Sequence, residues 1–168
     1  MKGLPMIWGN PDLAITKLLE FTNHFYLLVE EKSTGTGALE LLVDRYSGLV
    51  KSSPTTAWNA QYGRNQMGQG MMGRGMMGGQ SQPQPQPQAQ PQRQMAVSPE
   101  RATELAQQFL ARQLPGTALG EAWSLPGYYT LTINRDGRLF TLLSVNGLTG
   151  QVWLQSWHGG LIAEQAVP

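Results

Sequence analysis

The chain of 168 residues contains no cysteine and only two histidines, which narrows the chemistry that it offers. Without cysteine there is no disulfide, no thiolate metal site and no cysteine nucleophile. Only 14% of the residues are charged and the formal net charge is +1, so the composition does not indicate a nucleic-acid-binding protein. No apolar run is long enough to cross a bilayer, and residues 1–5 do not open a visible signal peptide.

Recognised catalytic and nucleotide-binding motifs are also missing. The eleven acidic residues are scattered rather than paired, and Glu30 and Glu31 point to opposite faces of one strand. The segment Gly73-Arg74-Gly75 lacks the Lys-Ser/Thr ending of a phosphate-binding loop. We therefore predict no catalytic residue, no cofactor-binding residue and no enzymatic activity.

Charge and composition divide the sequence into three regions. Residues 1–63 hold five Lys or Arg and six Asp or Glu, and residues 96–168 hold four and five. Residues 64–95 hold three Arg and no acid, and they are rich first in Gly and Met and then in Gln and Pro. This composition cannot form a core and predicts a flexible segment that passes into a stiffer, extended spacer. Two small blocks joined by a linker are expected.

The two blocks contain related stretches of sequence. An aromatic pair opens each stretch, apolar residues alternate within it, and a glycine turn closes it. The interval from Tyr26 to Gly48 is 22 positions, and the interval from Tyr129 to Gly150 is 21. This comparison pairs Tyr26 with Tyr129 and predicts two related α+β modules.

The first block is predicted to be a meander of antiparallel strands. In residues 13–21 the apolar positions share one parity, interrupted by Lys17, which favours a strand, although a helix is an alternative. Aromatic and β-branched residues predict further strands at 25–31 and 38–44 and a short last strand from Leu49.

The second block begins with a helix signal. Ser98 is the predicted N-cap and Pro99 occupies the first helical position. One helical face then carries Ala102, Leu105, Ala106, Phe109 and Leu110. Four strands are predicted after it, at about 119–125, 128–134, 139–145 and 151–157, and Asp136-Gly137 predicts a hairpin between the second and the third. A helix laid across one face of a sheet is expected.

The first block has no matching helix, because Pro5 and Pro11 interrupt the residues before its first strand. Its sheet therefore needs cover from the second module, from another chain or from a helix encoded upstream. Apolar burial is worth roughly 25 cal/mol per Å², so such a face is expected to find a contact. We predict partner-binding residues at Leu13, Ile15, Leu19, Phe21, Trp58 and Tyr62.

The linker contains five methionines, Met67, Met71, Met72, Met76 and Met77. Thioethers are soft ligands that favour Cu(I), so one hypothesis is a site for Cu(I) or Ag(I). The alternative is an adaptable surface segment, since Met fills irregular contacts.

Two further groups of residues have both a structural and a functional interpretation. His158 either ends a strand against Trp157 or binds a metal, for which the only other histidine is His24. The tryptophans at 58, 153 and 157 either complete two small cores or form an aromatic recognition surface. The structural interpretation is favoured for both groups.

The second block resembles a PepSY-like domain through Pro126-Gly127-Tyr128-Tyr129, the run 143–153 and the ending Trp157-His158-Gly159. In the first block the resemblance rests on Asn23-His24-Phe25-Tyr26 and on the segments 40–44, 58–59 and 62–63. The resemblance implies a tandem of small α+β domains, an extracytoplasmic setting in the periplasm, at the cell surface or after secretion, and a binding, inhibitory or chaperone-like role. It implies no catalytic residue.

Together these observations predict a non-enzymatic protein that associates with a protein partner or with further copies of itself. An uncovered apolar face and unpaired strand edges would provide the contacts. Head-to-tail contacts that do not close would produce a filament. Soft-metal binding by the linker is the second hypothesis.

Overall fold

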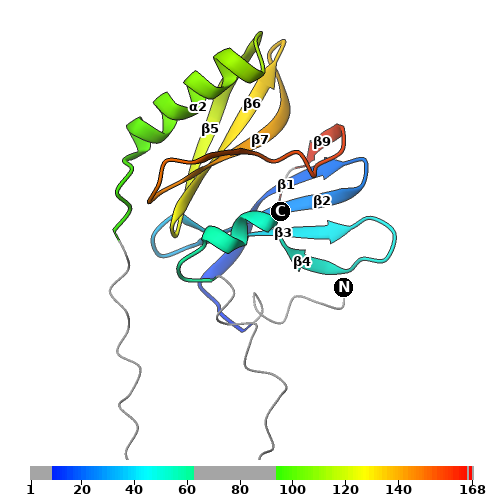
Figure 1. The fold of residues 1–168 in the computed structure, drawn as a ribbon. Coiled ribbons are helices and arrows are strands. Elements are labelled where there is room, and N and C mark those ends of the chain that lie inside the picture. The colour runs from blue at the N-terminus through cyan, green and yellow to red at the C-terminus, as the bar shows by residue number, and fades with distance from the viewer. Residues whose placement is uncertain (1–8, 63–93, 166, 168) are drawn as a thin grey trace, which may run out of the picture.

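Nine strands form two antiparallel sheets in the computed structural model, which describes residues 9–62, 94–165 and 167 (Figure 1). Sheet A has the strand order β4-β3-β2-β1-β9, and sheet B has the order β5-β6-β7-β8. Sheet A consists of β1 (Leu13–Phe21), β2 (His24–Glu31), β3 (Thr36–Asp44), β4 (Val50–Ser52) and β9 (Leu161–Gln165). Sheet B consists of β5 (Thr117–Leu125), β6 (Tyr128–Arg135), β7 (Arg138–Asn146) and β8 (Val152–Leu154).

One α-helix, α2 (Pro99–Gln113), and one 3₁₀-helix, η1 (Pro54–Trp58), complete the described elements. The expectation of an α+β protein with antiparallel sheets and a helix in the second half is confirmed. The Ser98 hydroxyl caps α2 by accepting the backbone N–H of Arg101 at 3.2 Å. The strand predicted at 151–157 is wrong in length, because it ends at Leu154, and β9 was not predicted.

The two meanders share the same pairing pattern. In sheet A, β2 pairs with β1 and β3 through a register that shifts once with each neighbour, and β6 shifts at corresponding places against β5 and β7. Phe25 lies opposite Val43, and Tyr129 lies opposite Val145. Phe25 therefore corresponds to Tyr129, so the pairing of Tyr26 with Tyr129 is wrong by one residue. The intervals to the closing glycines did not reveal this offset. The β2–β3 connection is longer than the β6–β7 connection, so the intervals in the two halves are not directly comparable.

A β-bulge in β1 divides the apolar residues that the sequence places on one face. Ile15 lies opposite Val29, whereas Lys17 lies opposite Leu28, so the register shifts between them. An extra residue reverses the side-chain alternation beyond it. Leu13 and Ile15 consequently pack in one apolar cluster, and Leu19 and Phe21 belong to another.

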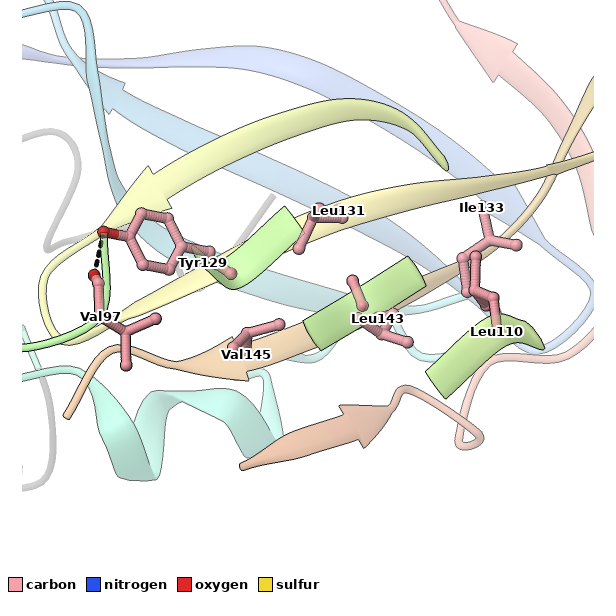
Figure 2. Packing of buried hydrophobic residues seen from close by; sticks show 9 residues of the cluster. Val97, Leu110, Tyr129, Leu131, Ile133, Leu143 and Val145 are labelled. Carbon is pink, nitrogen blue, oxygen red and sulfur yellow. Dashed lines mark hydrogen bonds between the residues drawn. The ribbon is translucent and has the colours of Figure 1, made fainter. Parts of the chain in front are cut away.

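The helix and the two sheets form three layers (Figure 1). On one face of sheet B, the buried side chains of Ala102, Ala106 and Leu110 of α2 pack in a cluster with Leu131 and Leu143 (Figure 2). The opposite face of sheet B packs on sheet A. That second cluster contains Leu125, Tyr128 and Leu142 of sheet B and Leu19, Phe21, Tyr26, Leu28 and Leu42 of sheet A.

Strand β9 joins the two halves of the chain a second time. After β8 the chain leaves sheet B, and Leu161–Gln165 then pairs antiparallel with β1 at the edge of sheet A. The backbone N–H of Thr22 also donates to the carbonyl of Gly160 at 2.9 Å. Because sheet B packs on one face of sheet A, the second half of the chain covers that face, as in the first of the three alternatives for its cover. Within the described ranges, no helix has the length and apolarity needed to span a membrane.

Candidate functional site

Glu40 is a carboxylate enclosed between the two sheets. It lies in the middle of β3 and is 0% exposed. Its oxygens accept hydrogen bonds from the hydroxyls of Tyr26 at 2.5 Å, Tyr128 at 2.8 Å and Thr55. Because Tyr26 belongs to sheet A, Tyr128 to sheet B and Thr55 to η1, a single carboxylate joins three elements. Hydroxyl donors offset the cost of removing this group from water.

The surroundings of Glu40 keep its tyrosine neighbours protonated. Burial, followed by the charge of Glu40, raises the pKa of Tyr26 and Tyr128 well above the usual range, so both stay protonated donors. No surface of Glu40 is open to a substrate. In the sequence Glu40 alternates with Leu39 and Leu41, whose side chains point to the opposite face of the strand. The local signal for burial was Leu42, which shares a face with Glu40 and belongs to the cluster between the sheets.

The two histidines lie together, although 134 positions separate them in the sequence. His24 Nε2 is 2.7 Å from His158 Nδ1, and His158 Nε2 is 2.7 Å from Gln155 Oε1. Gln155 Nε2 continues the chain of hydrogen bonds by donating to Ser144 Oγ at 2.8 Å. The His158 ring also stacks on Phe21, with ring centroids 4.3 Å apart.

The hydrogen bonds assign the protons of this chain. Because Gln155 uses its nitrogen to donate to Ser144, its oxygen faces His158 and accepts from Nε2–H. His158 Nδ1 is then an acceptor, and His24 Nε2 donates to it. Burial and the charge of a protonated His24 lower the pKa of His158 to about 3. Burial also lowers the pKa of His24, with Lys51 acting in the same direction and Asp44 opposing it.

The histidine pair holds the connection from sheet B to sheet A. It does not form a nucleophile–base pair, because Gln155 separates His158 from Ser144, and Ser144 is fully buried. Asn23 supports the same connection by accepting the backbone N–H of Gly159 at 3.0 Å. No group of three or more His, Cys, Asp or Glu suited to a metal lies within the ranges that the structure describes.

Three tryptophans gather where the two halves meet. Trp153 lies 5.4 Å from Trp58 and 4.9 Å from Trp157, measured between ring centroids. All three are half-buried. The indole N–H of Trp157 and the hydroxyl of Thr56 are buried atoms without a hydrogen-bond partner among the described residues. Trp58, Trp123 and Trp157 pack against the core between the sheets.

The residues predicted to bind a partner fall into two groups. Leu19 and Phe21 are fully buried between the sheets, and Trp58 packs against the same cluster. Leu13 is buried, and Ile15 and Tyr62 pack beside it in the other cluster of sheet A. Leu19 and Phe21 therefore already have contacts within the chain. The five predicted metal ligands, Met67, Met71, Met72, Met76 and Met77, lie outside the described residues.

Most of the outer strand edges carry features that discourage pairing with another strand. Strand β4 has Lys51 at its centre and Pro54 just after its end. The β5 register shifts between Leu119 and Ala122, where Glu121 binds Lys17 at 2.8 Å. Strand β9 carries Glu164. Charges, bulges and proline are the usual protection of sheet edges.

Strand β8 lacks charges, bulges and proline, and only its short length limits pairing with another strand. No charged residue, proline or register shift occurs in it or in its pairing with β7. A groove of about 200 Å³ lies beside it under α2, lined by Leu105, Gln108, Phe109, Arg112, Gln113 and Val152. The β8 edge and this groove are the candidate interaction surface, which we call the α2–β8 groove.

The sequence did not reveal the α2–β8 groove because its lining comes from two distant segments. Val152 was placed in a strand and Phe109 on the core face of a helix, but their proximity depends on the packing of α2 across sheet B. A second hollow lies at the β6–β7 hairpin, and only residues of that hairpin line it.

A scan of protein-family models matched none, and searches of curated proteins and of solved structures found no match.

Proposed function

We propose that this chain is a non-enzymatic binding and assembly protein that works by protein–protein association. The observation that carries this proposal is the unprotected β8 edge beside the α2–β8 groove, which has one apolar wall of Leu105, Phe109 and Val152. An open strand edge offers backbone donors and acceptors, and a neighbouring groove adds side-chain contacts. The partner is another protein, or further copies of this chain.

The buried ionisable groups support a role in binding. Glu40 is enclosed by three hydroxyl donors. His24 and His158 are hydrogen-bonded to one another at the connection between the sheets. Their protons and lone pairs are engaged in joining layers, and catalytic acids and bases must instead be positioned to reach a substrate.

We further propose that the two meanders are copies of one PepSY-like module. Their common strand order and matching register shifts support this proposal. The division into residues 1–63, a linker at 64–95 and residues 96–168 is part of it, with β9 contributed by the second part to the sheet of the first. The extracytoplasmic setting rests on the resemblance, and fractionation of cells that express the natural gene tests it.

Association is measured by light scattering over a range of concentrations and by selection from a phage-displayed library of short random peptides. Growth of the mean mass with concentration, or enrichment of peptides that bind the full chain, supports the proposal. A strict monomer that enriches no peptide would contradict it.

The methionine spacing favours a second candidate, binding of Cu(I) or Ag(I) by the linker. Met67 and Met71 are four positions apart, as are Met72 and Met76. Two to four thioethers can supply a soft-metal site without a charged ligand. Titration with Cu(I) under reducing conditions tests this candidate. Replacing all five methionines of the segment by Leu abolishes binding if they are the ligands, and unchanged binding by that variant would remove the candidate.

A further inference from the structure

The backbone of β8 presents three hydrogen-bonding groups away from its sheet. Asn146 N–H donates to the Gln151 carbonyl at 2.8 Å, and Gln155 N–H donates to the Leu142 carbonyl at 3.0 Å. Residues 151, 153 and 155 therefore direct their peptide groups toward β7, and alternation directs those of Val152 and Leu154 outward. The Leu154 carbonyl accepts from Ser156. The Val152 N–H and C=O and the Leu154 N–H have no partner within the described part of the chain.

The space beside this edge suits side chains of a strand better than a small molecule. Its volume is about 200 Å³, whereas small-molecule sites usually measure roughly 300–1,000 Å³. Leu105, Phe109 and Val152 supply its apolar wall, and each packs against the core of sheet B while retaining some exposure. A strand added to β8 would place alternate side chains on the helix side of the sheet, against this wall.

The charge on this flank of α2 is positive. Arg101, Leu105, Gln108 and Arg112 follow one another at helical spacing, and both arginines are exposed. Glu104 bonds Arg101 at 2.8 Å, whereas Arg112 has no ion pair among the described residues. No acidic side chain lines the groove. An acidic side chain in the added strand is therefore favoured near Arg112.

We propose that the α2–β8 groove receives an extended segment of a partner protein, which pairs antiparallel with β8 and carries an apolar residue beside an acidic one. This inference rests on the proposed protein-binding function and specifies its site and the chemistry of the partner. A second copy of β8 fits less well. In a two-fold pairing, the same arginine-bearing flank of each α2 borders the seam, and like charges oppose one another.

The test begins with peptides selected on the full chain from the phage-displayed library. The expected peptides alternate, with an apolar residue near an acidic one. Their affinity, measured by fluorescence anisotropy, falls by at least about tenfold in Val152→Lys, equivalent to about 1.4 kcal/mol. Ile162→Lys likewise introduces a lysine on an edge strand, β9, where Ile162 is 52% exposed, and is expected to leave binding unchanged.

The exposed position Arg112 provides a variant that does not depend on core packing. Arg112→Glu is expected to weaken binding of the acidic peptides and to enrich basic peptides when the selection is repeated. Arg138→Glu, on the β6–β7 hairpin and outside the groove lining, is the charge-reversal control. Peptide binding should also slow hydrogen exchange at the amides of Val152 and Leu154, while the Trp153 amide, which faces β7, changes little.

The outcomes separate the inference from the proposed function. Peptides that bind Val152→Lys as tightly as the unaltered chain, or that no longer bind Ile162→Lys, would overturn the groove assignment. The proposal of protein binding would remain. Selection of basic peptides by the unaltered chain would overturn the predicted partner charge. Failure to enrich any peptide would overturn the inference, and it would overturn the proposed function as well if the chain is also a monomer at every concentration.

Discussion

The histidine pair predicts that acid destabilises the folded protein well before the carboxylates titrate. His158 has a folded pKa of about 3, and the usual value for histidine in an unfolded chain is about 6.5. Between these values the unfolded chain binds more protons than the folded chain. Stability is therefore complete above about pH 6.5 and declines as the pH falls toward the folded pKa.

The size of the loss follows from the two pKa values. At about pH 5 the difference in proton binding costs about 2 kcal/mol, compared with about 0.2 kcal/mol at about pH 7. The result at pH 5 changes little if the folded pKa is one unit higher, because His158 is still neutral there. Protonation of His158 also removes the acceptor that His24 uses, which is the structural reason for resistance to a second proton. His24 adds to the loss, since its folded pKa is lowered too.

Urea unfolding followed by tryptophan fluorescence at about pH 7 and pH 5 measures this loss. The free energy of unfolding is expected to fall by at least about 2 kcal/mol. Asp44 and Glu100 also have lowered folded pKa values, but their contribution is lost at lower pH. The variant His158→Gln should show a shallower pH dependence than the natural chain, whatever its stability at pH 7. Equal slopes for the two proteins, or a change below about 0.5 kcal/mol, would refute the proton assignment.

Two substitutions test how the layers are joined. Tyr128→Phe removes the one hydroxyl that reaches Glu40 from sheet B, and unfolding in urea should require about 1.5–3 kcal/mol less free energy, the usual value of a hydrogen bond to a charged group. Gly127→Ala places a Cβ onto the carbonyl oxygen of Trp58, at a backbone φ of +94°. A loss of about 2 kcal/mol or more is expected in the same measurement, because left-handed backbone and steric overlap both oppose the methyl group.

Matched variants separate these effects from general ones. Tyr129→Phe removes a hydroxyl that bonds the neutral carbonyl of Val97 at 2.7 Å, so its cost should be smaller, about 0.5–1.5 kcal/mol. Gly137→Ala has φ +73° and no neighbour near the added Cβ, so only the conformational cost applies. If each control costs as much as its counterpart, neither the Glu40 bond nor the contact with Trp58 has the role assigned to it.

Local features of the sequence were sufficient to predict the elements that depend on neighbouring residues, such as helix starts and tight turns. Ser98 and Pro99 marked the start of α2, and Asp136-Gly137 marked a hairpin in which both residues have positive φ. The strands of both meanders were also found, because alternation and turn residues are local signals. The bulge in β1 was not predicted, because the alternation of apolar residues in the sequence is the same with or without a register shift.

Contacts between segments that are far apart in the sequence could not be predicted from local features. The contact between His24 and His158 could not be predicted, because nothing in the sequence shows that the chain returns to sheet A as β9. Glu40 and Leu42 share a face of their strand, and alternation alone does not distinguish a face that meets sheet B from one that meets water. The α2–β8 groove likewise depends on how the helix crosses its sheet.

The amino-acid sequence by itself determined the helix, the meanders, the near repetition of the two halves and the absence of cysteine chemistry, because these depend on residues close together along the chain. Only the tertiary structure decided that sheet B covers sheet A, that β9 completes the sheet of the other half, and that Glu40 and the histidine pair lie between the layers. Apolar faces of similar composition bury almost equally well against many surfaces. Their choice of partner is therefore fixed by shape and by the few buried polar groups that must find one another.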